Sequence, residues 1–241
     1  MAGNEATAGN ADKKAANGQG RAGDKGMPRQ RQSAAARAYE QIKEKILMGE
    51  IAPLQRIDEQ TLREELAVGR TPIREAIQHL SYDGLVTVVP FRGTIASGID
   101  LSDLDQIMEE RIPLEILGSR LAAERATRED VDKLRKRLEA YGDIAKLCEE
   151  GDFVDLLRLD EEMHQGITDL AQNKFLSRDV QRLRDLTWRF HILFYRRRRP
   201  TPDQSFNNYE ELIQALADGD PDEMERAVRA HFVDYLPTGP R

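Results

Sequence analysis

Three side chains that can bind a metal ion fall on the apolar faces of two expected helices. Asp160 and His164 are four residues apart, so they share one helix face with Leu156 and Ile167. His231 lies on the apolar face of the last expected helix. Buried carboxylates and imidazoles need partners, because their desolvation is otherwise unfavourable. The pattern therefore predicts a shared divalent metal, an anionic ligand, or a structural hydrogen bond between Asp160 and His164.

Two arginines are candidates for binding an acidic ligand in the same region. Arg111 lies on the inward face of the first expected helix after residue 98. A guanidinium can bind a carboxylate through two parallel hydrogen bonds, so Arg111 is a candidate clamp. The alternative is an ion pair with Glu115 or with a carboxylate on a neighbouring helix. Arg189 is the second candidate for an acidic ligand.

The N-terminal part of the chain has a different pattern, which is typical of a winged helix-turn-helix domain over residues 33–98. Helical periodicity is followed by short β-rich runs on both sides of a Pro-Phe-Arg-Gly turn at 90–93. Thr71 is expected to cap the third helix, with Pro72 in its first position. The expected elements are helices at 33–48, 58–66 and 71–82, with Asp58 capping the second, and strands at 85–89 and 94–96.

The third of these helices has the residues needed to contact DNA. Arg70 and Arg74 are expected at its N-terminal end, where a guanidinium can donate two hydrogen bonds to a guanine in the major groove. Thr71 and the free backbone amides there can contact phosphate. Arg92 and Gly93 form the expected wing tip, which can reach the minor groove or its backbone.

Gln60, on the preceding helix, is expected to contact the DNA backbone. For an isolated arginine, a solvated surface charge is the simpler interpretation.

The C-terminal part, residues 99–241, has helical periodicity throughout and no strand signal. Two capping boxes are expected, at Ser102 with Asp105 and at Thr127 with Asp130. The fold class is therefore mainly α, with the winged helix followed by a six-helix antiparallel bundle. The expected helices begin near residues 102, 127, 152, 175, 203 and 221.

Composition limits the partners of this chain of 241 residues. The formal net charge is −7, but residues 1–32 carry net +3 and residues 99–241 carry net −9. An anionic partner must therefore meet the first hundred residues or a local basic patch. Residues 1–32 have no Leu, Ile, Val or aromatic residue and are expected to be a disordered tail. No membrane span or secretion signal is expected, and the single cysteine, Cys148, favours the cytoplasm.

The run Val68–Ala76 (VGRTPIREA), with Asp83–Val86 and the Arg92-Gly93 pair, closely resembles the signature of the GntR family of bacterial transcription regulators. The resemblance covers residues 35–98. Two positions differ from the family pattern: Gly69 stands where Ser or Thr is usual, and Ala67 stands where Gly is usual. The resemblance implies that the arginines described above contact DNA.

The C-terminal part resembles the all-helical FCD effector domain of the FadR-type branch of that family. In that pattern an Asp-x-x-x-His pair and two later histidines hold a divalent metal beside a small carboxylate effector. Asp160, His164 and His231 match it, but Tyr209 takes the place of the other histidine. The site is then expected either to hold zinc, nickel or manganese with three ligands, or to have lost the metal and to use Tyr209 as a hydrogen-bond donor. His191 is a further candidate ligand.

These resemblances imply a regulator that senses a small metabolite, binds a palindromic double-stranded DNA operator as a homodimer, and acts as a repressor. The alternative is a metal-dependent enzyme that activates water at Asp160, His164 and His231. That alternative leaves the run at 70–74 unexplained, and no separate nucleophile or general base accompanies the three residues.

Overall fold

The first helix begins where the sequence provides a cap. In the computed structural model, α1 (Ala34–Leu47) follows Ser33, whose hydroxyl accepts a hydrogen bond from the Ala36 amide. The chain leaves the helix at Gly49, where φ is 73°, a value that glycine adopts without strain.

The structure describes residues 33–142, 153–195 and 209–235. All of them belong to one compact unit, residues 33–241. The expected disorder of the tail, 1–32, lies outside the described residues, as do the predicted ends of several helices.

The second and third helices, α2 (Glu59–Glu65) and α3 (Arg70–Tyr82), begin in different ways. Asp58 caps α2 as predicted, because its carboxylate accepts a hydrogen bond from the Gln60 amide. The prediction that Thr71 caps α3 is wrong. The helix starts one residue earlier, after Gly69, and has no side-chain capping bond.

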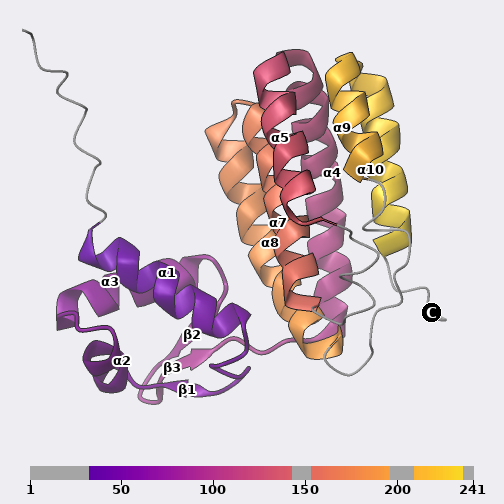
Figure 1. The fold of residues 1–241 in the computed structure, drawn as a ribbon. Helices are drawn as coiled ribbons and strands as arrows, with labels where there is room; N and C mark the ends of the chain where they lie inside the picture. The colour runs from indigo at the N-terminus through magenta and orange to yellow at the C-terminus, as the bar shows by residue number, and fades with distance from the viewer. Residues whose placement is uncertain (1–32, 143–152, 196–208, 236–241) are drawn as a thin grey trace, which may run out of the picture. The chain divides into compact units, whose positions relative to one another are not determined.

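A small antiparallel sheet completes the N-terminal domain. It contains β1 (Arg56–Ile57), β2 (Val86–Val89) and β3 (Gly93–Ala96), in the order β1-β3-β2 (Figure 1). Val86 pairs with Ala96 in the hairpin, so the wing tip lies between β2 and β3. The strand β1 was not predicted, because two residues are too few to show an alternating pattern.

The core of the N-terminal domain forms where α1 packs against α3 and where the sheet meets α3. Leu80 of α3 is fully buried in it. Its other buried apolar side chains include Ala38, Ile42, Ile46, Ile57, Leu62, Ile73, Ala76, Ile77, Leu85, Val86 and Ala96.

Among the described residues after 98, six helices lie side by side as a bundle (Figure 1). The central one is α4, which contacts four of the others: α7, α8, α9 and α10. The helices are α4 (Leu101–Arg125), α5 (Arg128–Ala140), α7 (Phe153–Leu170), α8 (Lys174–Tyr195), α9 (Tyr209–Asp218) and α10 (Pro221–Tyr235).

The capping predictions for the bundle had different outcomes. Thr127 and Asp130 form the expected capping box at the start of α5. The expected box at Ser102 is wrong, because Asp100 caps α4 by accepting a hydrogen bond from the Ser102 amide at 2.9 Å. Pro113 lies inside α4, where it has no amide to donate to the preceding turn.

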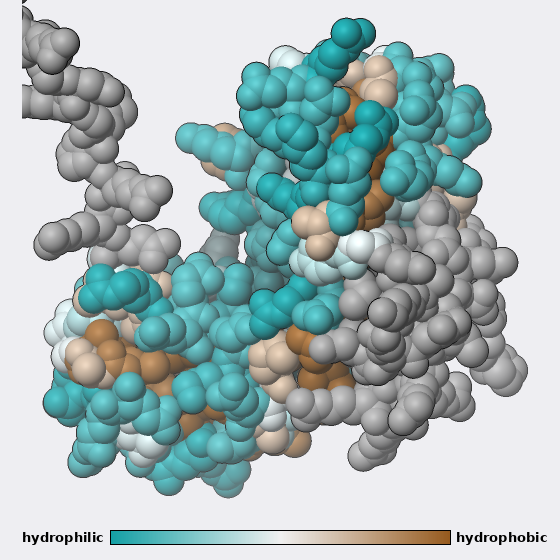
Figure 2. Space-filling view, viewed as in Figure 1, coloured by the Kyte–Doolittle hydropathy of each residue, from teal (hydrophilic) through white to brown (hydrophobic). Residues whose placement is uncertain are grey.

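The face of the bundle seen in Figure 2 is mainly hydrophilic, with apolar residues confined to narrow strips. Within residues 33–142, 153–195 and 209–235, no helix combines the length and the apolar composition needed to cross a membrane.

Removing a core side chain of α3 is expected to destabilise the N-terminal domain. Leu80→Ala should lower the free energy of unfolding by about 2–5 kcal/mol, because it removes a fully buried side chain. Val88→Ala is the control, since Val88 of β2 is 55% exposed. Urea unfolding followed by circular dichroism measures both. Equal midpoints for the two variants would contradict this account of the core.

Candidate functional site

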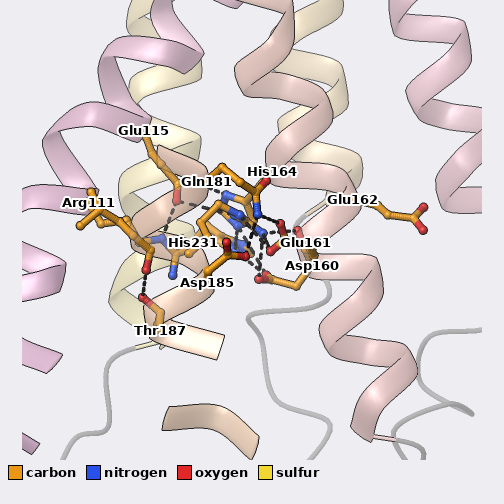
Figure 3. Close-up of polar contacts among 12 residues, drawn as sticks. Arg111, Glu115, Asp160, Glu161, Glu162, His164, Gln181, Asp185, Thr187 and His231 are labelled. Atoms are coloured by element: carbon orange, nitrogen blue, oxygen red, sulfur yellow. Dashed lines mark hydrogen bonds and ion pairs between the residues drawn. The ribbon is translucent and has the colours of Figure 1, made fainter. Parts of the chain in front are cut away.

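Charged and polar side chains gather in the interior of the bundle, where apolar residues would normally lie. Figure 3 shows Arg111 and Glu115 of α4 facing Asp160 and His164 of α7 and His231 of α10. All five are at least nine-tenths buried. Arg184 of α8 and Tyr209 of α9, also buried, complete what we call the polar cluster.

Three atoms of metal-binding types converge in the polar cluster. His164 Nε2 lies 2.9 Å from His231 Nε2 and 3.5 Å from Asp160 Oδ1. His231 Nε2 lies 3.7 Å from the same carboxylate oxygen. Two imidazoles and one carboxylate form a donor set that suits divalent transition metals. The structure therefore brings the three predicted ligands together, and their chemistry fits a metal ion.

Glu115 is the carboxylate that links the two sides of the polar cluster. It accepts a hydrogen bond from Arg111 Nε at 2.5 Å, contacts His164 Nδ1, and lies 3.6 Å from Arg184 Nη1. Burial would raise the pKa of Glu115, but the three neighbouring positive or ionisable groups outweigh it and hold the pKa well below its usual range.

Asp160 is held by a second group of donors. The Tyr209 hydroxyl donates a hydrogen bond to Asp160 Oδ1 at 2.6 Å, and Arg184 Nη2 lies 3.7 Å from Asp160 Oδ2. Arg184 also forms an ion pair of 2.9 Å with Glu161. Burial opposes the ionisation of Asp160, but His164 and the other donors keep its pKa well below the usual value.

The histidines of the bundle have different protonation equilibria. Burial would lower the pKa of His164, but the carboxylates of Glu115 and Asp160 outweigh burial and raise it. Burial lowers the pKa of His231, and it lowers that of His191 to about 3. His164 is therefore the histidine that the polar cluster favours in its charged form.

The polar cluster leaves little free space in this state. The cavity beside Arg111, Asp160 and Arg184 has a volume of about 10 Å³, close to the minimum for one water molecule. An organic ligand can therefore enter only if the side chains of the cluster rearrange.

The N-terminal domain presents a separate set of cations on its surface. Arg70, at the start of α3, and Arg92, at the wing tip, are exposed, and their guanidinium groups pair with no residue in the described part of the chain. Arg74 is also exposed but forms an ion pair with Glu59 at 3.2 Å. Arg70 and Arg92 are thus available to an external anion, whereas Arg74 must exchange its partner.

The wing tip has a projecting aromatic side chain. Phe91 is fully exposed and has a φ of 61°, which non-glycine residues rarely adopt. Gly93 has a φ of 88°, and the guanidinium of Arg56 lies beside it. Phe91 and Arg56 were not predicted as site residues, although an aromatic residue in a Pro-x-Arg-Gly turn is visible in the sequence.

The comparisons with known proteins match both parts of the chain. The gntR family of bacterial regulatory proteins matches residues 34–95, and the FCD domain matches residues 106–234, more than half of the chain. The chain belongs to the GntR family of transcription regulators and carries an FCD domain. The expected family is therefore confirmed, and the metal-dependent enzyme is set aside because this family consists of regulators.

Individual relatives agree with this assignment. The Nta operon transcriptional regulator of Aminobacter aminovorans is 31% identical over 188 residues, which cover 76% of this chain and 84% of that protein. The transcriptional repressor RspR of Escherichia coli is 26% identical over 182 residues, covering 76% and 78%. The solved structure of E. coli McbR/YncC has the same fold, with a TM-score of 0.74 at 21% identity, and covers 85% and 95% of the two chains.

The structure places the other predicted residues of this GntR regulator as follows. Arg111 forms the ion pair with Glu115 that was the alternative to a free carboxylate clamp. Tyr209 lies in the polar cluster, as the resemblance implied. Arg189 does not belong to the cluster, because it donates a hydrogen bond to the Ser97 carbonyl and lines another cavity.

His191 lines the small cavity beside the polar cluster and is not among the three converging ligands. In the N-terminal domain, the side-chain amide of Gln60 (Nε2) donates a hydrogen bond to Glu64 Oε1. Thr71 is exposed.

Two charged members of the buried network, Arg184 and Glu161, were not predicted. A signal for Arg184 was present. It lies four residues from the buried Val180 and from Trp188 on α8, so it falls on an inward face. Its partners come from α4 and α7, and helix periodicity does not identify partners on other helices.

Glu115→Gln is expected to be strongly destabilising, because it leaves two buried arginines without their shared carboxylate. The expected loss in the free energy of unfolding is about 3–5 kcal/mol. Glu110→Gln on the same helix is the matched control, since its ion pair with Arg182 is exposed. Urea unfolding of both variants is the measurement. A Glu115→Gln protein as stable as the control would show that the polar cluster is not held together by Glu115.

Proposed function

We propose that this chain is a repressor that binds its operator as a homodimer and is controlled by a small carboxylate effector bound in the FCD bundle. The observation that carries the proposal is the polar cluster, in which Arg111 and Arg184 are buried beside three metal-binding side chains. A buried arginine pair is suited to a carboxylate ligand, because each guanidinium can donate two hydrogen bonds to it.

The DNA-binding part of the proposal rests on the unpaired cations of the N-terminal domain. Arg70 is placed by the start of α3 to enter the major groove, and the backbone amides beside it lack a capping side chain. Arg92 and Gly93 extend the contact from the wing tip, while Thr71 and Gln60 are available to phosphates. Two such domains in a homodimer fit a palindromic operator, since a two-fold operator repeats the half-site.

The proposal also includes repression as the mode of regulation and the cytoplasm as the location. The relative RspR is named a repressor, and an operator-bound dimer that leaves the DNA on effector binding is the simplest repressor mechanism. A regulator that acts on DNA in a bacterium works in the cytoplasm, which agrees with a chain that has one cysteine, Cys148.

The effector must act by changing the polar cluster. The cavity of about 10 Å³ has no room for a metabolite, so a carboxylate can bind only where the ion pairs of Arg111 or Arg184 are exchanged for its own oxygens. We therefore expect the effector-bound bundle to differ from the effector-free one in the side chains of Arg111 and Arg184, on α4 and α8. The effector shifts the balance between the two states by its difference in affinity for them.

A divalent ion would be held by Asp160, His164 and His231, with zinc, nickel and manganese as candidates. When bound, such an ion would supply a positive charge that attracts a carboxylate oxygen of the effector. Glu115 orients His164 through Nδ1, as carboxylates commonly do for histidine ligands. Tyr209 donates its hydrogen bond to Asp160 Oδ1 and so competes for the oxygen that the ion would use.

Arg70→Ala is expected to reduce operator affinity by about 1–3 kcal/mol and to relax base preference at one position of each half-site. Lys133→Ala is the control, because Lys133 is an exposed cation of α5 in the bundle. Fluorescence anisotropy with an operator selected from genomic fragments measures both variants. If Arg70→Ala binds the operator as tightly as Lys133→Ala does, α3 does not read the DNA as proposed.

Tyr209→His is expected to raise zinc affinity, because it replaces a neutral phenol with an imidazole nitrogen, a fourth ligand beside Asp160, His164 and His231. Tyr209→Phe separates this effect from the loss of the hydrogen bond to Asp160. Calorimetric titration with zinc, together with metal analysis of protein purified without chelators, gives the affinity and the stoichiometry. Equal zinc affinity in the wild type and in Tyr209→His would overturn the proposed ligand set.

A further inference from the structure

Arg189 of α8 is buried without a carboxylate partner. The residue is only 4% exposed. Its guanidinium donates a hydrogen bond to the carbonyl oxygen of Ser97, in the segment that leads from β3 into α4. No carboxylate of the described residues lies within ion-pairing distance of its guanidinium. A neutral carbonyl compensates a buried positive charge only in part.

Arg184, on the same helix, is a buried arginine that does have carboxylate partners. It is also buried, but Glu161, Glu115 and Asp160 surround it and raise its pKa. By contrast, burial lowers the pKa of Arg189 to about 10. A guanidinium with this pKa is still charged at neutral pH. Arg189 is therefore a buried cation without the neighbouring carboxylates that Arg184 has.

The space for an anion is present next to Arg189. A cavity of about 300 Å³ is lined by Arg189, by Ser97 and by Gln106 of α4, with Ile107 and Phe190 as apolar walls. This volume is at the lower end of the range for small-molecule sites. Asp103 also lines the cavity, but its exposed carboxylate forms no ion pair with Arg189.

We propose that this cavity binds a small anion, a carboxylate or a phosphate, through the guanidinium of Arg189, at a site distinct from the polar cluster. Both kinds of anion have paired oxygens that match the two-pronged donor of arginine. Binding of the anion does not depend on the proposed effector function. Its consequence does: the ligand would share Arg189 with Ser97, in the segment that joins the two domains, so we expect it to change operator affinity.

The test is thermal unfolding of the full chain in increasing inorganic phosphate or succinate, with ionic strength held constant by sodium chloride. Arg189→Met is the test variant, and Arg178→Met, an exposed arginine on the same helix, is the matched control. Wild type and Arg178→Met should show a rise in Tm with at least one anion, because binding to the folded state alone stabilises it. Arg189→Met should show no rise.

Without added anion, Arg189→Met should melt at or above the wild-type temperature, because it removes an incompletely compensated buried charge. The anion that raises the Tm identifies the class of ligand. A rise with phosphate alone indicates a phosphate site, a rise with succinate alone indicates a carboxylate site, and a rise with both indicates a site for either anion. The absence of any rise in the wild type, or an equal rise in Arg189→Met, would overturn the proposal.

Two further variants keep the test decisive. Gln106→Glu places a carboxylate in the cavity and should abolish the anion response even if Arg189→Met does not fold. Tyr209→Phe alters the polar cluster and should keep the response, so loss of the response there would assign the anion to the cluster instead. Operator affinity, measured with and without the active anion, then tests the consequence separately from binding.

Discussion

The FCD bundle depends on compensating charges that it has removed from water. Glu115 is shared by Arg111, His164 and Arg184, and Asp160 lies on the other side of the same network. Each ion is stable in the interior only while its partners remain. Removing one partner of a buried ion pair lowers the free energy of unfolding by far more than the intact pair contributes to it. In the proposed function, a ligand can enter the polar cluster only by taking over partners that the protein now supplies itself.

The arginines of the bundle and those of the N-terminal domain differ in whether they are already paired. In the bundle, Arg111 and Arg184 are already paired with carboxylates, so each would have to give up a partner to bind a ligand. In the N-terminal domain, Arg70 and Arg92 have no ion-pair partner among the described residues, so they can contact an external anion without losing one. In the proposed function, DNA binding therefore adds contacts, whereas effector binding exchanges one ion pair for another.

Local rules in the sequence predicted much of this structure. Helical periodicity placed Asp160, His164 and His231 inward, and the Thr127 capping box formed as expected, because both depend on residues within one or two turns. The cap at Thr71 failed because Gly69, two residues earlier, suits the N-cap position about as well as threonine does. The partners of Arg184 come from other helices, and no local pattern records which helices will meet.

Pro113 gives the network a mechanical consequence. It lies on α4 between Arg111 and Glu115, and without its amide one carbonyl of the preceding turn has no bond along the helix axis. The backbone hydrogen bonding of α4 is thus interrupted beside Arg111 and Glu115, the two α4 residues that a ligand entering the polar cluster would disturb. A bend at Pro113 would change the angle between the two parts of α4, and the first part follows directly from the segment after β3.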